Sequence, residues 1–346
     1  MSLMSVVKVG VNGFGTIGRR VALAITLQKE LKLVGVVKRT PDYAALYAAS
    51  RGIPIYTPTA KEAEEFEKRG IKVGGTLREL LARVDVIVDA TPEGQGAKNK
   101  PLYREAGVKQ VYQGGEKPEV AEASFSTLCN YEESKGKGSL RVVSCNTTGL
   151  LRLICTLNRE FGVESVRAVL VRRGADPKEV KRGPIDSIVL NPPTLPSHHA
   201  VDVRTVLPWL DIKTAAVAVP TTFMHMHHVT LKLAKPVERR EVLETLASAP
   251  RIMLVSSGDT GIKSTSQLVD AARLSRMGYD IPELVVFEES VAVDGREVML
   301  FQAVHQESIV VPENIDAIRA VASSPLTLDE TLKATDGSLG LRKTLW

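Results

Sequence analysis

Short apolar runs alternate with helical patterns over residues 1–143 of this 346-residue chain. Between the first two runs, Ile17, Val21 and Ile25 recur at the spacing of one helix face. Strands that alternate with crossover helices predict an α/β fold, here a Rossmann-type, doubly wound parallel sheet. The expected strands are 6–11, 33–37, 85–90, 110–113 and 140–143.

The pattern changes after residue 143. One helical stripe spans residues 146–161, and the apolar runs that follow it lack intervening helical patterns. Such runs predict an α+β domain with a mainly antiparallel sheet. A final helix is expected to start near Pro312 and Glu313, because proline and an acidic residue suit a first helical turn. The expected strands are 166–171, 214–219, 229–233, 252–255, 285–287 and 298–304.

A glycine-rich turn joins the first expected strand to the first expected helix. Gly13, Gly15 and Gly18 fit the G-x-G-x-x-G fingerprint of dinucleotide-binding folds. In that fingerprint the glycines allow a tight turn, a close approach of the backbone to pyrophosphate, and close packing of helix on strand. The N-terminus of the helix then holds phosphate. The turn therefore predicts a nicotinamide dinucleotide site.

The end of the second expected strand lacks the acidic residue that usually binds the adenosine ribose. It carries Lys38, Arg39 and Thr40 instead. A carboxylate there would repel a 2′-phosphate, whereas these side chains can hold one. We therefore expect NADP to be used at least as well as NAD. The alternative is that Lys38 and Arg39 only point to solvent.

Cys145 lies where a strand is expected to end and the 146–161 helix to begin. The positive end of the helix dipole should lower the pKa of its thiol, and a thiolate is the nucleophile that an aldehyde requires. A buried structural cysteine is the alternative. The other two cysteines, Cys129 and Cys155, can pair with each other or remain buried thiols. Three cysteines are too few for a secreted disulfide framework or a zinc cluster.

All six histidines lie in the second half of the chain. A thiol nucleophile needs a proton partner, and strand alternation would place His225 and His227 on one face. A core or surface position is the alternative for each of them. We expect no metal site, because cysteine and carboxylate ligands are missing near this pair. Candidate phosphate donors are Arg172, Arg173, Lys178, Lys181, Arg182, Ser197, His198, His199 and residues 263–265.

These features predict two domains. Residues 1–143 are expected to form a dinucleotide-binding domain, with the helical region 312–346 packing back on it, and residues 144–311 a catalytic domain. The net charge of +5 comes from interspersed residues rather than from a block, so we expect no nucleic-acid partner. No apolar run approaches the roughly 20 residues of a membrane span, and no signal-peptide pattern is visible. The protein is expected to be soluble and cytoplasmic, with no membrane partner.

Several motifs together resemble the glyceraldehyde-3-phosphate dehydrogenase family in its archaeal form. They cover both expected domains and keep their order. Bacterial and eukaryotic relatives are expected to carry Cys-Thr-Thr-Asn after the serine, whereas this chain has the short form. The matching stretches are VGVNGFGTIGRRVA at 9–22, QGGEK at 113–117, VVSCNTTGL at 142–150, VRRGADP at 171–177, PSHH at 196–199, VPTTFMHMH at 219–227 and AVHQESIVVPENIDAIRA at 303–320.

The resemblance implies a role for each matching residue. Cys145 would be the nucleophile and His225 the general base, with Ser144 and Asn146 beside the substrate. His198 and His199 would bind the substrate phosphates. The cofactor contacts would be Thr16, Ile17, Gly114, Arg173 and Gln306, together with the fingerprint glycines and Lys38.

The resemblance also implies the reaction. It is the reversible, phosphorylating oxidation of D-glyceraldehyde 3-phosphate to 1,3-bisphosphoglycerate with NADP or NAD, in glycolysis or gluconeogenesis, by a homotetramer. Cys145 would add to the aldehyde, hydride would leave for the nicotinamide, and inorganic phosphate would attack the thioester. The alternatives are an aspartate-semialdehyde dehydrogenase, which needs an arginine for an α-carboxylate, and a redox-sensing or nucleic-acid-binding protein that kept the fold without catalysis.

Overall fold

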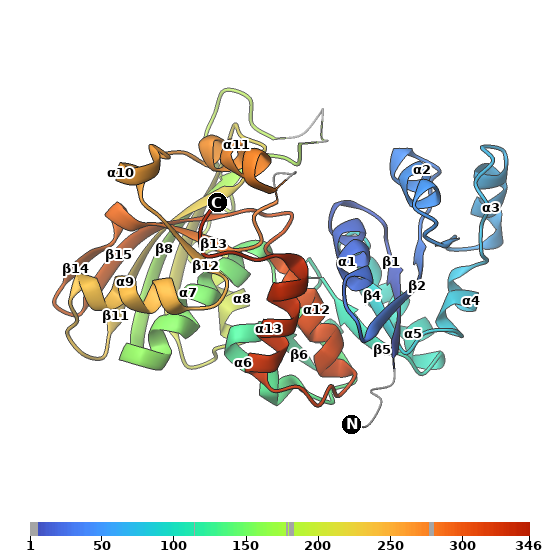
Figure 1. The fold of residues 1–346 in the computed structure, drawn as a ribbon, viewed down its shortest axis with the longest axis horizontal. Helices are drawn as coiled ribbons and strands as arrows, with labels where there is room; N and C mark the ends of the chain where they lie inside the picture. The colour runs from blue at the N-terminus through green and yellow to red at the C-terminus, as the bar shows by residue number, and fades with distance from the viewer. Residues whose placement is uncertain (1–5, 114, 178, 180–182, 277–279) are drawn as a thin grey trace. The chain divides into compact units, whose positions relative to one another are not determined.

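The computed structural model describes residues 6–113, 115–177, 179, 183–276 and 280–346 (Figure 1). The chain divides into two compact units. Unit 1 comprises Met1–Val143 and Val311–Leu339, and unit 2 comprises Ser144–Val310 and Gly340–Trp346.

The last seven residues differ from the sequence prediction, which assigned the whole of 312–346 to the first domain. They group with unit 2 because their contacts lie there. The backbone N–H of Arg342 donates to Glu283 Oε1 at 2.6 Å, and Leu345 is buried in an apolar cluster of that unit. The periodicity of apolar residues in the sequence could not predict either contact.

The core of unit 1 is a seven-stranded sheet in the order β3-β2-β1-β4-β5-β7-β6. Its described neighbouring pairs are parallel, as predicted. The two shortest strands, β3 and β6, were not predicted, because two or three residues show no periodicity. The strands are β1 (Val7–Asn12), β2 (Leu31–Val37), β3 (Ile55–Tyr56), β4 (Val86–Asp89), β5 (Lys109–Tyr112), β6 (Ala123–Phe125) and β7 (Ser139–Val142).

Helices connect these strands. Strand β1 pairs with β2 on one side and with β4 on the other, so the order of the sheet reverses beside β1, at the position where such sheets bind ligands. The helices of unit 1 are α1 (Thr16–Thr26), α2 (Tyr43–Ser50), α3 (Ala60–Glu67), α4 (Leu77–Leu81), α5 (Gln95–Glu105), the 3-10 helix η1 (Pro118–Val120), α6 (Thr127–Ser134), α12 (Val310–Val321) and α13 (Leu328–Leu339).

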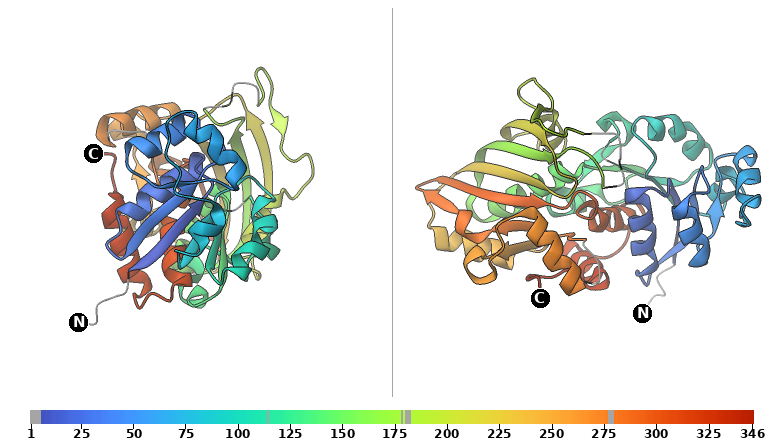
Figure 2. Two further views of the ribbon diagram at one scale, coloured as in Figure 1. Left: turned by 90° about the vertical axis from the view of Figure 1, so that its right-hand side faces the viewer. Right: turned by 90° about the horizontal axis from the view of Figure 1, so that it is seen from above.

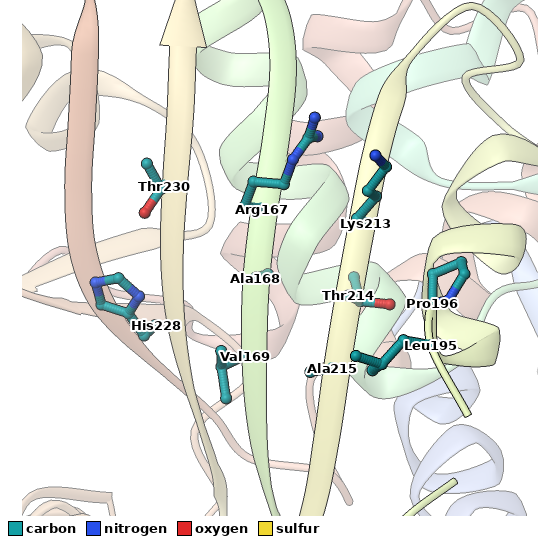
Figure 3. A pocket seen from close by; sticks show the side chains of 10 residues that line it. All are labelled: Arg167, Ala168, Val169, Leu195, Pro196, Lys213, Thr214, Ala215, His228 and Thr230. Atoms are coloured by element: carbon teal, nitrogen blue, oxygen red, sulfur yellow. The ribbon is translucent and has the colours of Figure 1, made fainter. Parts of the chain in front are cut away.

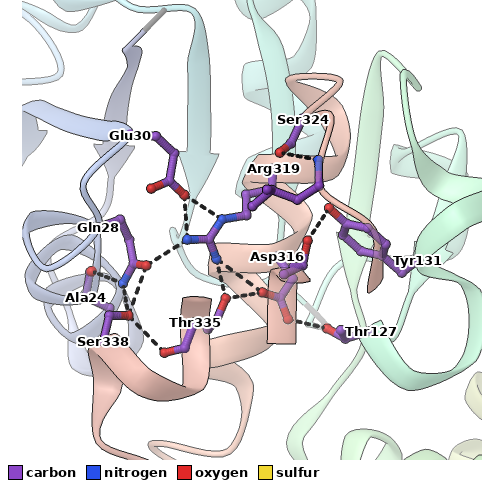
Figure 4. Close-up of polar contacts among 12 residues, drawn as sticks. Ala24, Gln28, Glu30, Thr127, Tyr131, Asp316, Arg319, Ser324, Thr335 and Ser338 are labelled. Carbon is purple, nitrogen blue, oxygen red and sulfur yellow. Dashed lines mark hydrogen bonds and ion pairs between the residues drawn. The ribbon is translucent and has the colours of Figure 1, made fainter. Parts of the chain in front are cut away.

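A buried arginine ties α12 and α13 to the sheet domain (Figure 4). The guanidinium of Arg319 contacts Glu30 Oε1 at 2.5 Å and donates to Gln28 Oε1 at 2.8 Å. It also donates to Thr335 of α13 and lies 3.5 Å from Asp316 Oδ1. These partners are as many as 291 residues away in sequence. We call this group the arginine network.

The core of unit 2 is an eight-stranded sheet in the order β12-β13-β15-β11-β8-β10-β9, with β14 beside β15. Figure 2 shows its green, yellow and orange strands side by side, out of chain order. The strands are β8 (Val163–Arg173), β9 (Val189–Leu190), β10 (Asp211–Val219), β11 (His225–Leu233), β12 (Ile252–Val255), β13 (Leu284–Phe287), β14 (Ala292–Asp294) and β15 (Glu297–Val304).

Most pairs in this sheet are antiparallel, as predicted, but β8 with β10 and β12 with β13 are parallel. The expectation that no helices intervene is wrong at these places. A parallel pair needs a crossover, which α8 and α11 supply. The helices of unit 2 are α7 (Cys145–Phe161), α8 (His198–Arg204), α9 (Arg239–Ser248), α10 (Ser257–Thr260), α11 (Thr265–Arg276) and the 3-10 helix η2 (Glu288–Ser290).

The two faces of this sheet differ. Helix α7 packs against β8, β11 and β15, and α8 packs against β10. Alternate residues of β11 are buried, beginning with His225 and His227. The opposite face carries exposed apolar side chains, including Val169 and Phe301, each 44% exposed. The buried face is therefore the one that receives Cys145 at the start of α7.

Candidate active site

The glycine turn after β1 has the geometry that a dinucleotide requires. Gly13 has φ +103°, and a Cβ added to it would lie 2.6 Å from the carbonyl oxygen of Ala90. A Cβ on Gly18 would lie 1.8 Å from the carbonyl oxygen of Gly13, so helix and turn pack too closely for any side chain. A Cβ on Gly15 would meet nothing within 4 Å, which leaves open space beside the turn.

The start of α1 also fits an anion. Its N-cap, Gly15, provides no side-chain hydrogen bond, so the first backbone N–H groups of the helix stay available. The hydroxyl oxygen of Thr16 is buried and has no hydrogen-bond partner among the described residues. Free N–H groups, an orphaned hydroxyl and open space are the features that a pyrophosphate would satisfy. Ile17, also predicted to contact cofactor, is half-buried in the same turn.

The end of β2 carries an ion pair that the sequence did not reveal. Lys38 Nζ lies 2.7 Å from Asp42 Oδ2, and Asp42 Oδ1 caps α2 by accepting from the N–H groups of Ala44 and Ala45. These partners lower the pKa of the Asp42 carboxyl against the opposing effect of burial, the largest single influence on it. The charge of Lys38 is thus compensated by Asp42, whereas the side chain of Arg39 is exposed.

The sequence predicted three other cofactor contacts, which are Gly114, Gln306 and Arg173. Gly114 lies outside the described residues. Gln306 uses its side-chain oxygen to accept from the backbone N–H of Met224 at 2.9 Å, so it holds the turn that leads into β11. Arg173 ends β8, where Nη2 lies 2.5 Å from Asp176 Oδ1.

Cys145 is the first residue of α7. Ser144 is the N-cap, and its hydroxyl oxygen accepts from the backbone N–H of Thr147 at 3.4 Å. The hydroxyl of Thr147 in turn donates to Asp202 Oδ2 at 2.6 Å, which fixes the first turn of α7 to α8. Cys145 is half-buried and is the free cysteine among the described residues.

The side chain of His225 contacts the thiol of Cys145. Its Nε2 lies 3.6 Å from Cys145 Sγ, and its Nδ1 accepts the backbone N–H of Arg173 at 3.0 Å. Because Nδ1 is an acceptor, the neutral ring carries its proton on Nε2, directed at the sulfur. His225 can therefore donate to a thiolate at Cys145.

Burial controls the ionisation of this pair. It raises the pKa of the Cys145 thiol, and the positive charges of Arg173 and Arg172 oppose it. The expected lowering of the thiol pKa is therefore wrong in direction, because desolvation outweighs the positive surroundings. Burial, followed by the neighbouring His227 and Arg173, also holds the pKa of His225 well below its ordinary value.

Two arginines next to this pair keep unused donors. Arg172 donates through Nη1 to Asn191 Oδ1 at 2.7 Å, and burial lowers the pKa of its guanidinium. The Nε atoms of Arg172 and Arg173 are buried without hydrogen-bond partners among the described residues. A buried N–H donor without a partner is costly, so an anion bound here would be stabilised by both side chains.

Asn146, which follows Cys145, contacts two buried histidines through its side-chain amide. Its Oδ1 lies 2.9 Å from His227 Nε2, and its Nδ2 lies 3.3 Å from His199 Nε2. The chain continues from His227 Nδ1 to Gln302 Nε2 at 3.0 Å and from His199 Nδ1 to the hydroxyl of Ser197 at 3.0 Å. These residues come from α7, α8, β11 and β15 and from the N-cap of α8.

The adjacent histidines of α8 differ in their surroundings. His198 is exposed, whereas His199 is 1% exposed. Their rings lie 4.0 Å apart between centroids. Burial, followed by the proximity of His198, lowers the pKa of His199 to about 2. Because its side chain is exposed, His198 is the more accessible of the two to a phosphate, whereas both ring nitrogens of the buried His199 contact protein groups.

Sequence reasoning missed several residues of this region. It did not single out Asp42, Asp202, Thr214 or Gln302. The partners of the last three lie far away in the chain, whereas Asp42 pairs with Lys38 only four positions before it. Strand alternation in 298–304 was a usable signal for Gln302, because a buried glutamine on an apolar face needs a polar neighbour. Within the described ranges, no cluster of three or more metal-binding side chains occurs, and no helix is long and apolar enough to cross a membrane.

Two family descriptions match the chain. Residues 144–290 match the C-terminal domain of glyceraldehyde 3-phosphate dehydrogenase. Residues 7–114 match the N-terminus of dihydrodipicolinate reductase. Each match falls within one of the two structural units.

Full-length relatives are also similar to the chain. A glyceraldehyde-3-phosphate dehydrogenase of Aeropyrum pernix is 98% identical over 343 residues, which is 99% of this chain and 100% of the relative. Relatives of the same description from Hyperthermus butylicus and Sulfurisphaera tokodaii are 61% and 53% identical, each over 98% of this chain and 99% of the relative.

Proposed function

Because the chain belongs to the glyceraldehyde-3-phosphate dehydrogenase family, we propose that it catalyses the reversible, phosphorylating oxidation of D-glyceraldehyde 3-phosphate to 1,3-bisphosphoglycerate. The reaction uses a nicotinamide cofactor, serves glycolysis or gluconeogenesis, and takes place in the cytoplasm. The observation that carries the proposal is the 3.6 Å contact between Cys145 Sγ and His225 Nε2 at the start of α7.

The two units have separate roles in this proposal. Unit 1 binds the dinucleotide, with the pyrophosphate at Gly13, Gly15, Thr16 and Gly18, where the glycine geometry and the orphaned Thr16 hydroxyl fit it. Ile17, Lys38, Gly114, Arg173 and Gln306 remain predicted cofactor contacts. Unit 2 carries the reacting thiol. The bound nicotinamide supplies the acceptor for the hydride of the substrate.

Cys145 forms the covalent bond to the substrate. Its thiolate attacks the aldehyde carbon, and the hemithioacetal becomes a thioester when hydride leaves. Inorganic phosphate then attacks the thioester carbon, and the Cys145 thiolate departs. Burial raises the pKa of this thiol. The fraction of Cys145 present as thiolate therefore depends on the positive end of the α7 dipole and on the charges of Arg172 and Arg173, which stabilise the anion.

His225 is the proton partner in this scheme. With its proton on Nε2, it stabilises the thiolate and then the oxygen of the hemithioacetal by hydrogen bonding. The general-base role implied by the family requires Nε2 to be unprotonated. In the neutral ring the proton then lies on Nδ1, so Nδ1 no longer accepts the hydrogen bond from the backbone N–H of Arg173. Asparagine can replace a donor but not a base, so His225→Asn and His225→Ala separate the two roles.

Phosphate binding is supported by Arg172, Arg173 and His198. The unpartnered Nε atoms of both arginines and the exposed ring of His198 suit the phosphate of the aldehyde and the attacking inorganic phosphate. Ser144 and Asn146 lie at the start of α7, and His199 of α8 contacts Asn146, so we retain the three as predicted substrate-site residues.

Absorbance of the reduced nicotinamide tests the proposal. With D-glyceraldehyde 3-phosphate and cofactor, turnover should require inorganic phosphate, and Cys145→Ser should lower it by at least about 1,000-fold because a hydroxyl is a far weaker nucleophile. Turnover that ignores phosphate would mean that the thioester is hydrolysed. Absence of turnover with either cofactor would remove the proposal.

Cofactor preference is a separate part of the proposal: NADP is used at least as well as NAD. The support is that the nearest acid, Asp42, is paired with Lys38, while Arg39 is exposed. The ratio of kcat/KM for NADP to that for NAD should fall in Arg39→Ala. It should rise in Asp42→Asn, because asparagine keeps the helix cap and releases Lys38. If this ratio of kcat/KM values is unchanged in both variants, the proposed use of NADP is contradicted.

We also propose a homotetramer. The outer face of the unit 2 sheet exposes Val169 and Phe301 and contains a hollow of about 450 Å³ (Figure 3). The nearby segment 185–195 exposes Ile185, Ile188 and Leu195. An apolar face of this kind suits a second copy of the chain. Light scattering should give a tetramer that dissociates in Val169→Glu, whereas a monomeric native chain would contradict the proposal.

A further inference from the structure

A single chain of hydrogen bonds passes through the residue that follows the nucleophile. It runs from Gln302 through His227, Asn146, His199 and Ser197 to Thr214, and its described distances lie between 2.7 and 3.3 Å. The members are distributed over α7, β10, β11, β15, α8 and the N-cap of α8. We call it the histidine relay.

The direction of the relay is fixed at Thr214. The hydroxyl of Thr214 donates to the carbonyl oxygen of Ser197 at 3.2 Å and accepts from the backbone N–H of Ala200. The 2.7 Å contact between the two hydroxyls therefore uses the proton of Ser197. Ser197 Oγ is then the acceptor for His199 Nδ1–H, which leaves His199 Nε2 to accept from the amide of Asn146.

The hydrogen bonds at the Gln302 end of the relay have the same donor-to-acceptor direction. Asn146 Oδ1 accepts from His227 Nε2–H, and His227 Nδ1 accepts from the amide of Gln302. Gln302 Oε1 is left buried without a partner among the described residues. The reverse direction would instead orphan an N–H group of Gln302, and orphaned buried N–H groups are rarer than orphaned carbonyl oxygens. Each member thus donates to the next, and both histidines are uncharged.

We propose that the histidine relay is a positioning device that fixes Asn146, and through it the first turn of α7, so that Cys145 Sγ stays within reach of His225 Nε2. Gln302, His227, Ser197 and Thr214 are its positioning residues, and none of them contacts the sulfur in the described hydrogen bonds. The proposal adds a role for these residues to the proposed function, on which its activity readout rests.

Its physical basis is that Asn146 is covalently attached to Cys145 and is 2% exposed. A side chain held at both amide atoms loses its freedom to rotate, and the adjacent backbone is fixed with it. A displacement of about 1 Å at a reacting atom can cost about 100-fold in rate. Loss of the relay should therefore affect reactivity more than folding.

Thr214→Val tests the relay, because valine has the same shape without the hydroxyl. Two readouts are used: the rate of Cys145 alkylation by iodoacetamide against pH, without substrate, and kcat and KM for the dehydrogenase reaction. We expect a shifted alkylation profile and a kcat about 10-fold to 100-fold lower, with a smaller change in KM. Thr214→Ser should restore both, because it restores the hydroxyl.

Thr331→Val is the matched control. Thr331 is a buried threonine of unit 1 whose hydroxyl donates to Tyr131 at 2.8 Å, so the variant loses a similar hydrogen bond without touching the relay. Its alkylation profile should equal that of the native chain. An unchanged profile in folded Thr214→Val, or an equal shift in Thr331→Val, overturns the proposal. Because alkylation requires no substrate, this result is independent of whether the proposed function holds.

Gln302→Glu gives a second test should Thr214→Val fail to fold. A carboxylate cannot donate to His227 Nδ1, so the ring must place a proton there. Histidine ¹⁵N spectra should show an unprotonated Nδ1 at His227 in the native chain and a protonated one in the variant, with the alkylation profile shifted as well. A native His227 already protonated at Nδ1 contradicts the stated direction and overturns the proposal.

Discussion

The arginine network of unit 1 and the histidine relay of unit 2 are both buried and polar, but they solve different problems. In the first, Arg319 is surrounded by Glu30, Asp316 and neutral acceptors, so full charges compensate one another. In the second, burial keeps His227 and His199 neutral. The charged network attaches two helices to a sheet, whereas the neutral one surrounds a reactive group without adding charge to it.

The difference matters for the chemistry of Cys145. A charged relay beside the sulfur would change the thiol pKa each time a proton entered or left. Neutral histidines avoid this, and Arg172 and Arg173 remain the charges that act on the thiolate. The contrast makes separate predictions for stability and for reactivity.

The largest effect on stability is expected from Arg319→Met. Removing the guanidinium leaves Glu30 and Asp316 without compensation, and breaking a buried ion pair in this way costs about 3–5 kcal/mol. Unfolding in guanidinium chloride measures the loss. The triple variant Arg319→Met, Glu30→Gln, Asp316→Asn should regain a large part of it, since the uncompensated charges are gone.

Arg167→Met is the matched control for that prediction. Arg167 pairs with Asp211 at 2.6 Å, but both side chains are about half exposed, so the expected loss is far smaller than that of Arg319→Met. Equal losses in Arg167→Met and Arg319→Met would show that burial does not distinguish the pairs. Cys145 alkylation should be unchanged in both variants.

A pH dependence of stability is the next effect in size. Burial lowers the pKa of His227 to about 3 and of His199 to about 2, whereas in the unfolded chain both titrate near their ordinary value of about 6.5. Between these limits the unfolded state binds more protons, so stability is complete above about pH 6.5 and falls as pH decreases toward 3. Each histidine contributes a slope of about 1.4 kcal/mol per pH unit.

Denaturant unfolding between pH 4 and pH 6 measures this slope. The variant His227→Gln should lower the number of protons taken up on unfolding by about one, because glutamine does not titrate. A slope that stays the same in His227→Gln would mean that this histidine is charged in the folded protein.

The smallest effect is expected at an exposed hydrogen-bonded group. Thr59 caps α3, and Glu62 completes a capping box by accepting from the Thr59 backbone. Thr59→Ala should cost about 1 kcal/mol, as is usual for helix caps, and should leave Cys145 alkylation unchanged. Thermal unfolding measures it. A loss of stability as large as that of Arg319→Met would contradict the expectation that an exposed helix cap contributes less than a buried polar network.

The glycine turn after β1 and the start of α7 show what local sequence could predict. Gly13 and Gly18 occupy positions where a Cβ would clash with backbone, and Cys145 does begin α7. Both features depend on residues within a few positions of each other. Strand alternation likewise predicted that His225 and His227 share a face.

The features that the sequence did not predict have different causes. The thiol pKa of Cys145 was predicted to fall, but desolvation by neighbouring elements raises it. The ion pair of Lys38 with Asp42 was not predicted, although the two residues are only four positions apart. The helices α8 and α11, which make two strand pairs parallel, were overlooked.

The sequence alone determined the five longer strands of unit 1, the glycine turn after β1, the position of Cys145 at the start of a helix, and the family. These are encoded by spacing along the chain, where periodicity and turn chemistry act. Only the tertiary structure decided which histidine faces Cys145, the neutral state of the relay, and the return of 340–346 to unit 2. Asn146 meets His199 and His227 across 53 and 81 residues, and burial depends on such distant neighbours rather than on local pattern.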